Sequence, residues 1–135
     1  DGSYILRIGN KFYVPYIAVG YGVQEYDPEN DTWRVLYLDN LPNNAVAFSD
    51  KDFALGYTIG GGGMGYATGA VVRYSLNVNG NLFLQDYAQA PTGGYTNFFK
   101  AFSAVINNEV YYGMGYFNMN GGVAIQGTAF WRYRY

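Results

Sequence analysis

The sequence predicts an all-β protein, and three observations support that fold class. Aromatic residues make up 20% of the 135 residues, including 16 tyrosines, and aromatic side chains favour strands. The 19 glycines recur between short apolar runs, where they provide turn positions. A pattern of strand, polar turn, strand and glycine-rich loop occurs three times along the chain. Together these features predict a single repeat domain over residues 1–135.

Each copy of the pattern begins with an apolar or alternating strand followed by a polar turn. The predicted first strands are residues 4–8, 45–49 and 100–106, and the last two share the sequence Ala-Phe-Ser. The turns are residues 9–11, 50–52 and 107–109, which are rich in Gly, Asn and Asp. These residues tolerate the backbone angles of a tight reversal, so we expect a hairpin at each turn.

The second, third and fourth strands follow in the same order in each copy. The second strands are expected at residues 12–14, 53–55 and 110–112, each running into glycine. The third strands are expected at residues 23–26, 71–74 and 129–133. The fourth strands are expected at residues 33–38 and 82–87, and the third copy has none. The pattern therefore predicts eleven strands.

The strongest single motif is Tyr-Asp-Pro-Glu-Asn-Asp-Thr-Trp at residues 26–33, between the third and fourth strands of the first copy. Weaker counterparts surround Tyr74 and Tyr133. In the second copy, Asn79-Gly80 supplies the reversal, and Phe83 is expected to take the place of Trp33 in the core. The third copy carries an apparent insertion at residues 118–127.

These residues resemble the kelch repeat, in which four strands and paired glycines build one blade of a β-propeller. The resemblance implies a kelch-like propeller segment of about three four-stranded blades, the last lacking its fourth strand. The expected blades are residues 4–42, 45–91 and 100–135. Residues 45–49 and 130–133 look like the variant of exported bacterial proteins, Bacteroidetes types especially, which implies an extracellular or cell-surface location. A β-sandwich or barrel with internal duplications remains the alternative fold.

Three blades are too few for a closed ring, because known propellers have about four to eight. Open ends expose apolar faces and unpaired strand edges that invite association. We therefore expect either part of a larger propeller or a protomer whose neighbours complete the ring. A dimer would close the ring, and head-to-tail contacts would give an open fibre.

Composition excludes several classes of function. The formal net charge is −2 and the cations are scattered, which argues against nucleic-acid binding. No apolar stretch reaches the roughly 20 residues of a membrane span. The sequence contains no cysteine and no histidine, so disulfides, thiolate metal sites and the commonest general base are ruled out. The absence of both also rules out copper chemistry like that of galactose oxidase, and we expect no cofactor and no catalysis.

Two segments resemble ligand-binding loops but fit structural roles better. Asp27, Glu29 and Asp31 alternate as in a calcium loop, yet Thr32 and Leu38 stand where that loop needs Gly and Glu. A hairpin turn is the preferred interpretation. The glycine run at residues 60–63 lacks the Lys and Ser or Thr of a phosphate loop, so it is expected to be a connecting loop. The matching loop at residues 113–122 is longer and more apolar, and could contact a partner.

The aromatic residues provide the remaining indication of function. Tyr26, Trp33, Tyr74 and Trp131 are expected to fill space between and within blades. Possible contacts with a partner or ligand are the predicted loop residues Tyr16, Tyr21, Tyr66, Tyr95 and Phe117. The sequence therefore predicts a non-catalytic module for protein binding or assembly. The alternatives are a self-assembling extracellular fibre or sheet subunit and a carbohydrate-binding module for a glycan.

Overall fold

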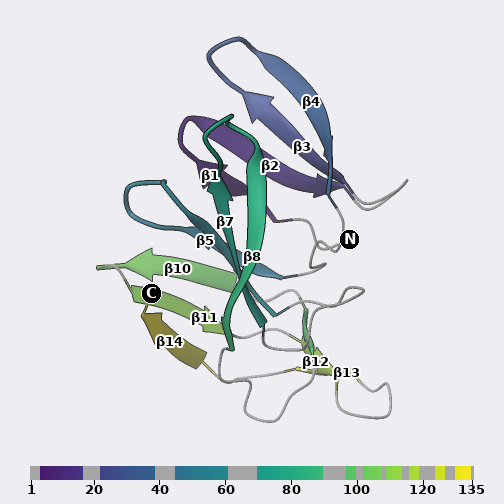
Figure 1. Ribbon diagram of the computed structural model, residues 1–135. Helices are drawn as coiled ribbons and strands as arrows, with labels where there is room; N and C mark the ends of the chain where they lie inside the picture. Colours follow the sequence, from purple (N-terminus) through teal and green to yellow (C-terminus); the bar gives the residue numbers. More distant parts are fainter. Residues whose placement is uncertain are drawn as a thin grey trace.

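The computed structural model shows an all-β protein built from four antiparallel sheets (Figure 1). It describes residues 4–16, 22–38, 45–60, 70–89, 97–99, 102–107, 109–113, 116–118, 124–126 and 130–134. Within these residues there are fourteen strands and no helix, which confirms the predicted fold class. Because this part of the chain holds only strands, it contains no apolar helix of membrane-spanning length.

The first sheet contains four strands that follow one another in chain order. They are β1 (Leu6–Ile8), β2 (Lys11–Tyr16), β3 (Gly22–Asp27) and β4 (Thr32–Tyr37). The β1–β2 turn is Gly9-Asn10, with Gly9 at a φ of 61°. Glycine adopts that angle without steric cost, so the predicted hairpin forms, with a turn of two residues because Lys11 already belongs to β2.

The second sheet repeats the same order. Its strands are β5 (Val46–Ser49), β6 (Gly56–Ile59), β7 (Ala70–Leu76) and β8 (Leu82–Gln89). The β7–β8 turn contains Gly80 at a φ of 73°, and the Asn77 side chain accepts hydrogen bonds from the Asn79 and Asn81 amides. The predicted reversal at Asn79-Gly80 is confirmed.

The second strand of this sheet was wrongly predicted at residues 53–55. Ser49 pairs with Gly56, so residues 50–55 form the turn and β6 begins at Gly56. The Asp50 carboxylate accepts the Leu55 amide at 3.0 Å, and Phe53 has a φ of 55°. An acid that caps its own turn competes with strand pairing, which explains why these apolar residues are not a strand.

The third sheet has three strands, β10 (Phe102–Ile106), β11 (Glu109–Gly113) and β14 (Phe130–Arg134), as expected for a copy without a fourth strand. A fourth, smaller sheet contains β9 (Asn97–Phe99), β12 (Tyr116–Asn118) and β13 (Ala124–Gln126). The predicted loop at residues 113–122 and the insertion at 118–127 therefore contribute strands. Strands β9, β12 and β13 were not predicted, and they account for the difference between the fourteen strands observed and the eleven predicted.

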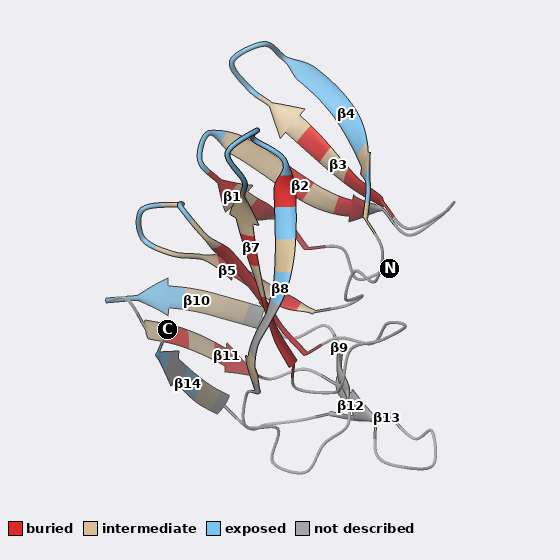
Figure 2. Cartoon of the chain, in the orientation of Figure 1, coloured by how far each residue is buried: buried red, intermediate tan, exposed pale blue. Residues whose placement is uncertain are grey.

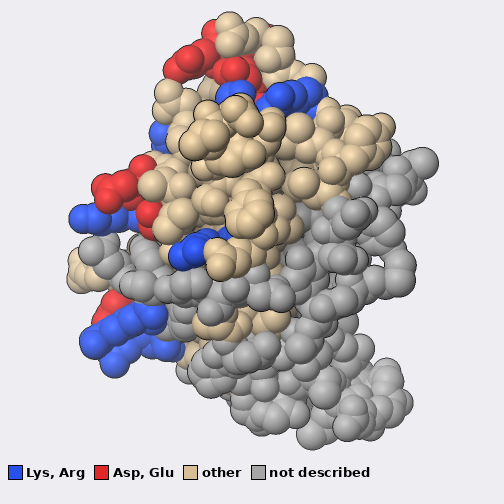
Figure 3. Space-filling model, viewed as in Figure 1, with Lys and Arg blue, Asp and Glu red and all other residues tan. Residues whose placement is uncertain are grey.

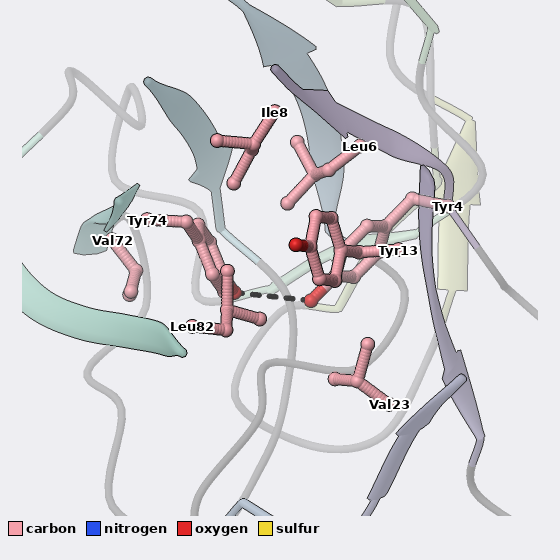
Figure 4. Packing of buried hydrophobic residues seen from close by; sticks show 8 residues of the cluster. All are labelled: Tyr4, Leu6, Ile8, Tyr13, Val23, Val72, Tyr74 and Leu82. Carbon is pink, nitrogen blue, oxygen red and sulfur yellow. Dashed lines mark hydrogen bonds between the residues drawn. The ribbon is translucent and has the colours of Figure 1, made fainter. Parts of the chain in front are cut away.

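The first and second sheets pack face to face. Their shared core contains Tyr4, Leu6, Ile8, Tyr13 and Val23 from the first sheet and its preceding residues, and Val72, Tyr74 and Leu82 from the second (Figure 4). The Tyr4 and Tyr74 hydroxyls lie 3.1 Å apart, and Thr58 Oγ1 lies 3.2 Å from the Tyr74 hydroxyl. Hydrogen bonding of these hydroxyls offsets the penalty of burying them.

The opposite face of the second sheet packs on the third sheet. This second core contains Val46, Phe48, Tyr57, Ile59 and Val71 from the second sheet, and Val110 and Tyr112 from the third. The Phe48 and Tyr57 rings stack at 5.2 Å, and Tyr112 stacks on Trp131 at 5.7 Å. The three sheets therefore form a stack in which the second sheet is covered on both sides (Figure 2).

One hydroxyl contact recurs at both steps of the stack. The Ser49 hydroxyl donates to the Arg7 carbonyl oxygen at 2.6 Å, and the Ser103 hydroxyl donates to the Ala47 carbonyl oxygen at 2.7 Å. Ser49 and Ser103 are the serines of the shared Ala-Phe-Ser sequence. Each one links the first strand of its sheet to the first strand of the preceding sheet. Strands β1, β5 and β10 consequently lie next to one another in sequence order.

Candidate interaction surfaces

The outer face of the first sheet is apolar and exposed. The term "outer face of the first sheet" denotes the surface formed by Ile5, Trp33, Val35 and Tyr37. Successive strand residues point to opposite faces, so the three β4 residues share the face that points away from the second sheet. Trp33 is 59% exposed and Tyr37 is 83% exposed. The exposed strand β4 is evident in Figure 2.

Trp33 was expected in the core, and that prediction is wrong. Its ring stacks on Tyr26 with the centroids 4.7 Å apart, but more than half of the Trp33 side chain stays exposed. Phe83, expected to replace it in the core, is 55% exposed. Both residues lie on fourth strands at the outer edges of their sheets, where aromatic residues gain less burial than in central strands. The prediction holds for Tyr74, which is buried, while Tyr26 and Trp131 are half-buried.

The motif at residues 26–33 forms the predicted hairpin turn between β3 and β4. Asp27 accepts hydrogen bonds from the Glu29 amide at 3.0 Å and from the Asn30 side chain at 3.1 Å. Asp31, with a φ of 50°, accepts the Tyr26 hydroxyl at 3.0 Å. These bonds occupy the carboxylates in holding the turn. We call this turn, with Asp27, Glu29 and Asp31, the acidic turn.

A buried ion pair lies on the other face of the first sheet, and sequence reasoning missed it. Glu25 is 2% exposed and binds Arg34 through two hydrogen bonds, at 2.6 and 2.9 Å, and Lys11 at 2.9 Å. Burial favours a higher Glu25 pKa, but the bonds from Arg34 and Lys11 outweigh it and lower the pKa overall. Glu25 therefore stays ionised at neutral pH.

Tyr13 lies directly opposite Glu25 in the register of β2 and β3. Its hydroxyl is buried, and no described group bonds it at normal hydrogen-bond distance and angle. Burial, and next the nearby Glu25 charge, raise the pKa of this hydroxyl. Tyr13 is a core residue with a neutral hydroxyl, and it does not have the lowered pKa of a nucleophile.

A second charged cluster lies on the outer face of the third sheet, the face directed away from the second sheet. Glu109 binds Arg134, lies 3.6 Å from Arg132, and accepts the Tyr111 hydroxyl at 2.9 Å. These bonds lower the Glu109 pKa, with Arg134 the largest cause. Ile106, from the same face, is 54% exposed. Two arginines share one carboxylate, so this face carries a net positive charge.

A groove of about 490 Å³ separates the turn after β5 from strand β10. Asp50, Lys51 and Phe53 line one side, and Ala104, Val105 and Asn107 line the other. Asp50 is engaged by the Leu55 amide, and the Phe53 ring lies 4.0 Å below the Arg7 guanidinium. Because these lining residues already have partners within the chain, we attribute the groove to the way in which the second and third sheets meet.

The five residues predicted to contact a partner are mostly outside the described residues. Tyr21, Tyr66 and Tyr95 lie outside them entirely. Tyr16 ends β2 and Phe117 lies in β12, but only their backbones are described. Phe117 pairs with Phe98 and Ile125 in the small sheet, and Tyr16 pairs with Gly22 in the first sheet. The loop positions predicted for Phe117 and Tyr16 are therefore wrong. The side chains of these five residues all lie outside the described part of the structure.

Fold and surfaces thus define a stack of antiparallel β-sheets with two exposed outer faces. A comparison with models of known protein families gives no match, and a comparison with curated proteins gives none either. Within the described residues, no group of three or more Asp and Glu side chains is placed to hold a metal ion.

Proposed function

We propose that this protein is a kelch-like, non-catalytic repeat module that acts in protein binding or assembly at the cell surface or outside the cell. The observation that carries the proposal is the repeated serine contact. Ser49 and Ser103 each donate to a carbonyl oxygen of the preceding first strand, which supports a similar step from the first sheet to the second and from the second to the third. A regular step of this kind is the property from which blade assemblies are built.

The order of strands supports the kelch-like part of the proposal. In the first two sheets the strands follow in chain order, and their first strands lie side by side while β4 and β8 form the opposite edges. In a propeller the first strand of each blade lines the axis and the last lies at the rim. The Tyr-Asp-Pro turn at residues 26–33 adds the sequence resemblance.

The roles of the Glu25 and Glu109 carboxylates support the non-catalytic part. Glu25 is held by Arg34 and Lys11, and Glu109 is held by Arg134 and Tyr111. Their pKa values are lowered, whereas a carboxyl that acts as a general acid needs a raised one. Both clusters serve to hold neighbouring strands together.

An experimental structure of the purified chain tests the blade arrangement. The proposal predicts that consecutive sheets are related by equal rotations of about 45 to 90° around one axis, as four to eight blades require. Two sheets packed as a sandwich without a common axis would contradict it. A screen of hydrolytic and redox substrates tests the rest, and turnover that persists through purification would overturn the non-catalytic assignment.

Glycan binding is a second candidate function, favoured by the exposed aromatic rings of Trp33 and Tyr37. Flat exposed rings can stack on sugars because they offer a large rigid area. A glycan array with the unmodified chain and with Trp33→Ala tests this role. A signal that Trp33→Ala abolishes supports it, and the absence of any signal contradicts it.

A further inference from the structure

We propose that the chain associates head to tail, with the outer face of the first sheet of one copy packed on the outer face of the third sheet of the next. The inference rests on the proposed assembly function and names its partner, which is a second copy of this chain. Each outer face corresponds to a face that, elsewhere in the stack, is covered by a neighbouring sheet.

The two existing interfaces show which faces fit together. Leu6 and Ile8 of β1 face the second sheet, and the corresponding β5 residues, Val46 and Phe48, face the third. Every sheet therefore uses the same face toward the sheet that follows it. At the third sheet this face is the one with Ile106 and the Glu109 cluster, and no described sheet covers it.

The opposite faces obey the same rule. Tyr74 of the second sheet and Tyr112 of the third face the preceding sheet and are fully buried. Tyr26 holds the place in β3 that Tyr74 holds in β7, so the face with Tyr26 and Trp33 is the one a preceding sheet would cover. In the first sheet this face stays exposed. A copy that presents its third sheet supplies the missing neighbour.

Charge complementarity selects the same partner. The acidic turn carries Asp27, Glu29 and Asp31, with one cation, Lys11, 3.8 Å from Asp27. The outer face of the third sheet carries Arg132 and Arg134 against a single Glu109. Figure 3 shows acidic side chains beside basic ones at the end of the molecule where the acidic turn lies, and a larger basic group beside an acidic one at the opposite end of the stack. The hairpin turns of all three stacked sheets lie along one edge (Figure 1). Continuing the stack would therefore bring the acidic turn of one copy beside these arginines of another.

Because the two faces differ, the contact is heterologous and leaves one free face at each end of any open assembly. This property allows a complementation test. The double variant V35K/Y37K blocks the first-sheet face, and I106K/R132E blocks the third-sheet face. All four side chains are exposed, so each variant is expected to fold. Circular dichroism and thermal unfolding of both variants check this requirement.

The measurement is the mass in solution by sedimentation, over a range of protein concentration. The unmodified chain is expected to rise above its monomer mass of 15.0 kDa as concentration increases. Each double variant alone is expected to remain a monomer, and an equal mixture of the two is expected to form a dimer through the remaining intact faces. Higher salt and R134Q are each expected to weaken the association about tenfold.

A folded, unmodified chain that is monomeric at every concentration overturns the proposal. Self-association of I106K/R132E alone also overturns it, because the first-sheet face would then pair with itself. Neither result contradicts the kelch-like arrangement of sheets, which depends on the rotation between sheets within one chain. The two proposals can therefore fail separately.

Discussion

Ser49 and Arg7 are joined by two hydrogen bonds that connect the first two sheets across 42 positions of sequence. The Ser49 hydroxyl donates to the Arg7 carbonyl oxygen at 2.6 Å and accepts the Arg7 amide at 3.2 Å. The Gly9 amide adds a bond to the Phe53 carbonyl oxygen at 2.6 Å. The edge of β1 is therefore paired by a serine side chain and a turn, although no strand extends its sheet on that side.

Replacing Ser49 by Ala is expected to lower the free energy of unfolding by about 1 to 2 kcal/mol, because two partly buried backbone groups lose their partner. Ser103→Ala is expected to have a smaller effect, since its hydroxyl makes one such bond. Urea unfolding measures both values. Thr32→Ala, at an exposed position, serves as the control. Equal stability of Ser49→Ala and the unmodified chain would contradict a role for this contact.

Gly56→Ala is expected to separate the first two sheets slightly. A Cβ at Gly56 would lie 3.2 Å from Ile8 Cδ1 and from Leu6 Cδ2, closer than ordinary contacts. Overpacking of this kind costs about 1 to 3 kcal/mol. Ile8→Val removes one of the crowded carbon atoms, so Gly56→Ala with Ile8→Val should be less destabilised than the sum of the single changes. A double-mutant cycle by urea unfolding measures the difference, and strict additivity would contradict this packing.

Tyr74→Phe removes the hydroxyl that lies between those of Tyr4 and Thr58. Each of these buried groups then loses one partner, and the expected loss of unfolding free energy is about 1 to 2 kcal/mol. Tyr37→Phe, on an exposed ring, is the matched control and should change stability by less than about 0.5 kcal/mol. Thermal unfolding compares the two. A Tyr74→Phe variant as stable as Tyr37→Phe would show that the buried hydroxyls gain nothing from their arrangement.

Glu25 makes stability depend on pH. Its pKa in the folded chain is lowered below the ordinary value of 4.5, so its contribution is fully present above 4.5 and is lost as pH falls through the folded pKa. Glu25→Gln leaves Arg34 and Lys11 without their carboxylate, and is expected to lower the free energy of unfolding at pH 7 by about 3 kcal/mol. As the pH decreases below 4.5, the free energy of unfolding of Glu25→Gln should also fall less steeply than that of the unmodified chain.

Unfolding curves at several pH values test this prediction, with Glu29→Gln as the control. Glu29 is exposed and accepts one hydrogen bond from Asn10, so its replacement should change the free energy of unfolding at pH 7 very little. If Glu25→Gln and Glu29→Gln gave the same acid unfolding curve, the buried ion pair would have no thermodynamic role.

Local features of the fold could be predicted from the sequence. The turn at residues 26–33 and the reversal at Asn79-Gly80 depend on short-range preferences of Asp, Asn, Pro and Gly, so both predictions are confirmed. The strand predicted at residues 53–55 does not form, because Asp50 caps a wider turn and Phe53 contacts Arg7 of the first sheet. That contact depends on a neighbouring sheet, which no local pattern encodes.

The surfaces were less predictable than the strands. An aromatic residue such as Trp33 has the same strand preference whether or not another sheet covers it, so its exposure could not be deduced from sequence. Glu25 stands between Gln24 and Tyr26 in β3, and the cations that neutralise it come from β2 and β4. The Ala-Phe-Ser sequences were recognised as a repeat, yet their serines connect different sheets. Such roles follow only from tertiary structure.

The central claim is that one step relates the three sheets in order. A nuclear Overhauser spectrum of the labelled chain tests it most directly, because it reports on both serine contacts at once. The account predicts cross-peaks between Ser49 and Arg7 and, in the same spectrum, between Ser103 and Ala47. A folded chain that shows only one of these pairs, or neither, would contradict it.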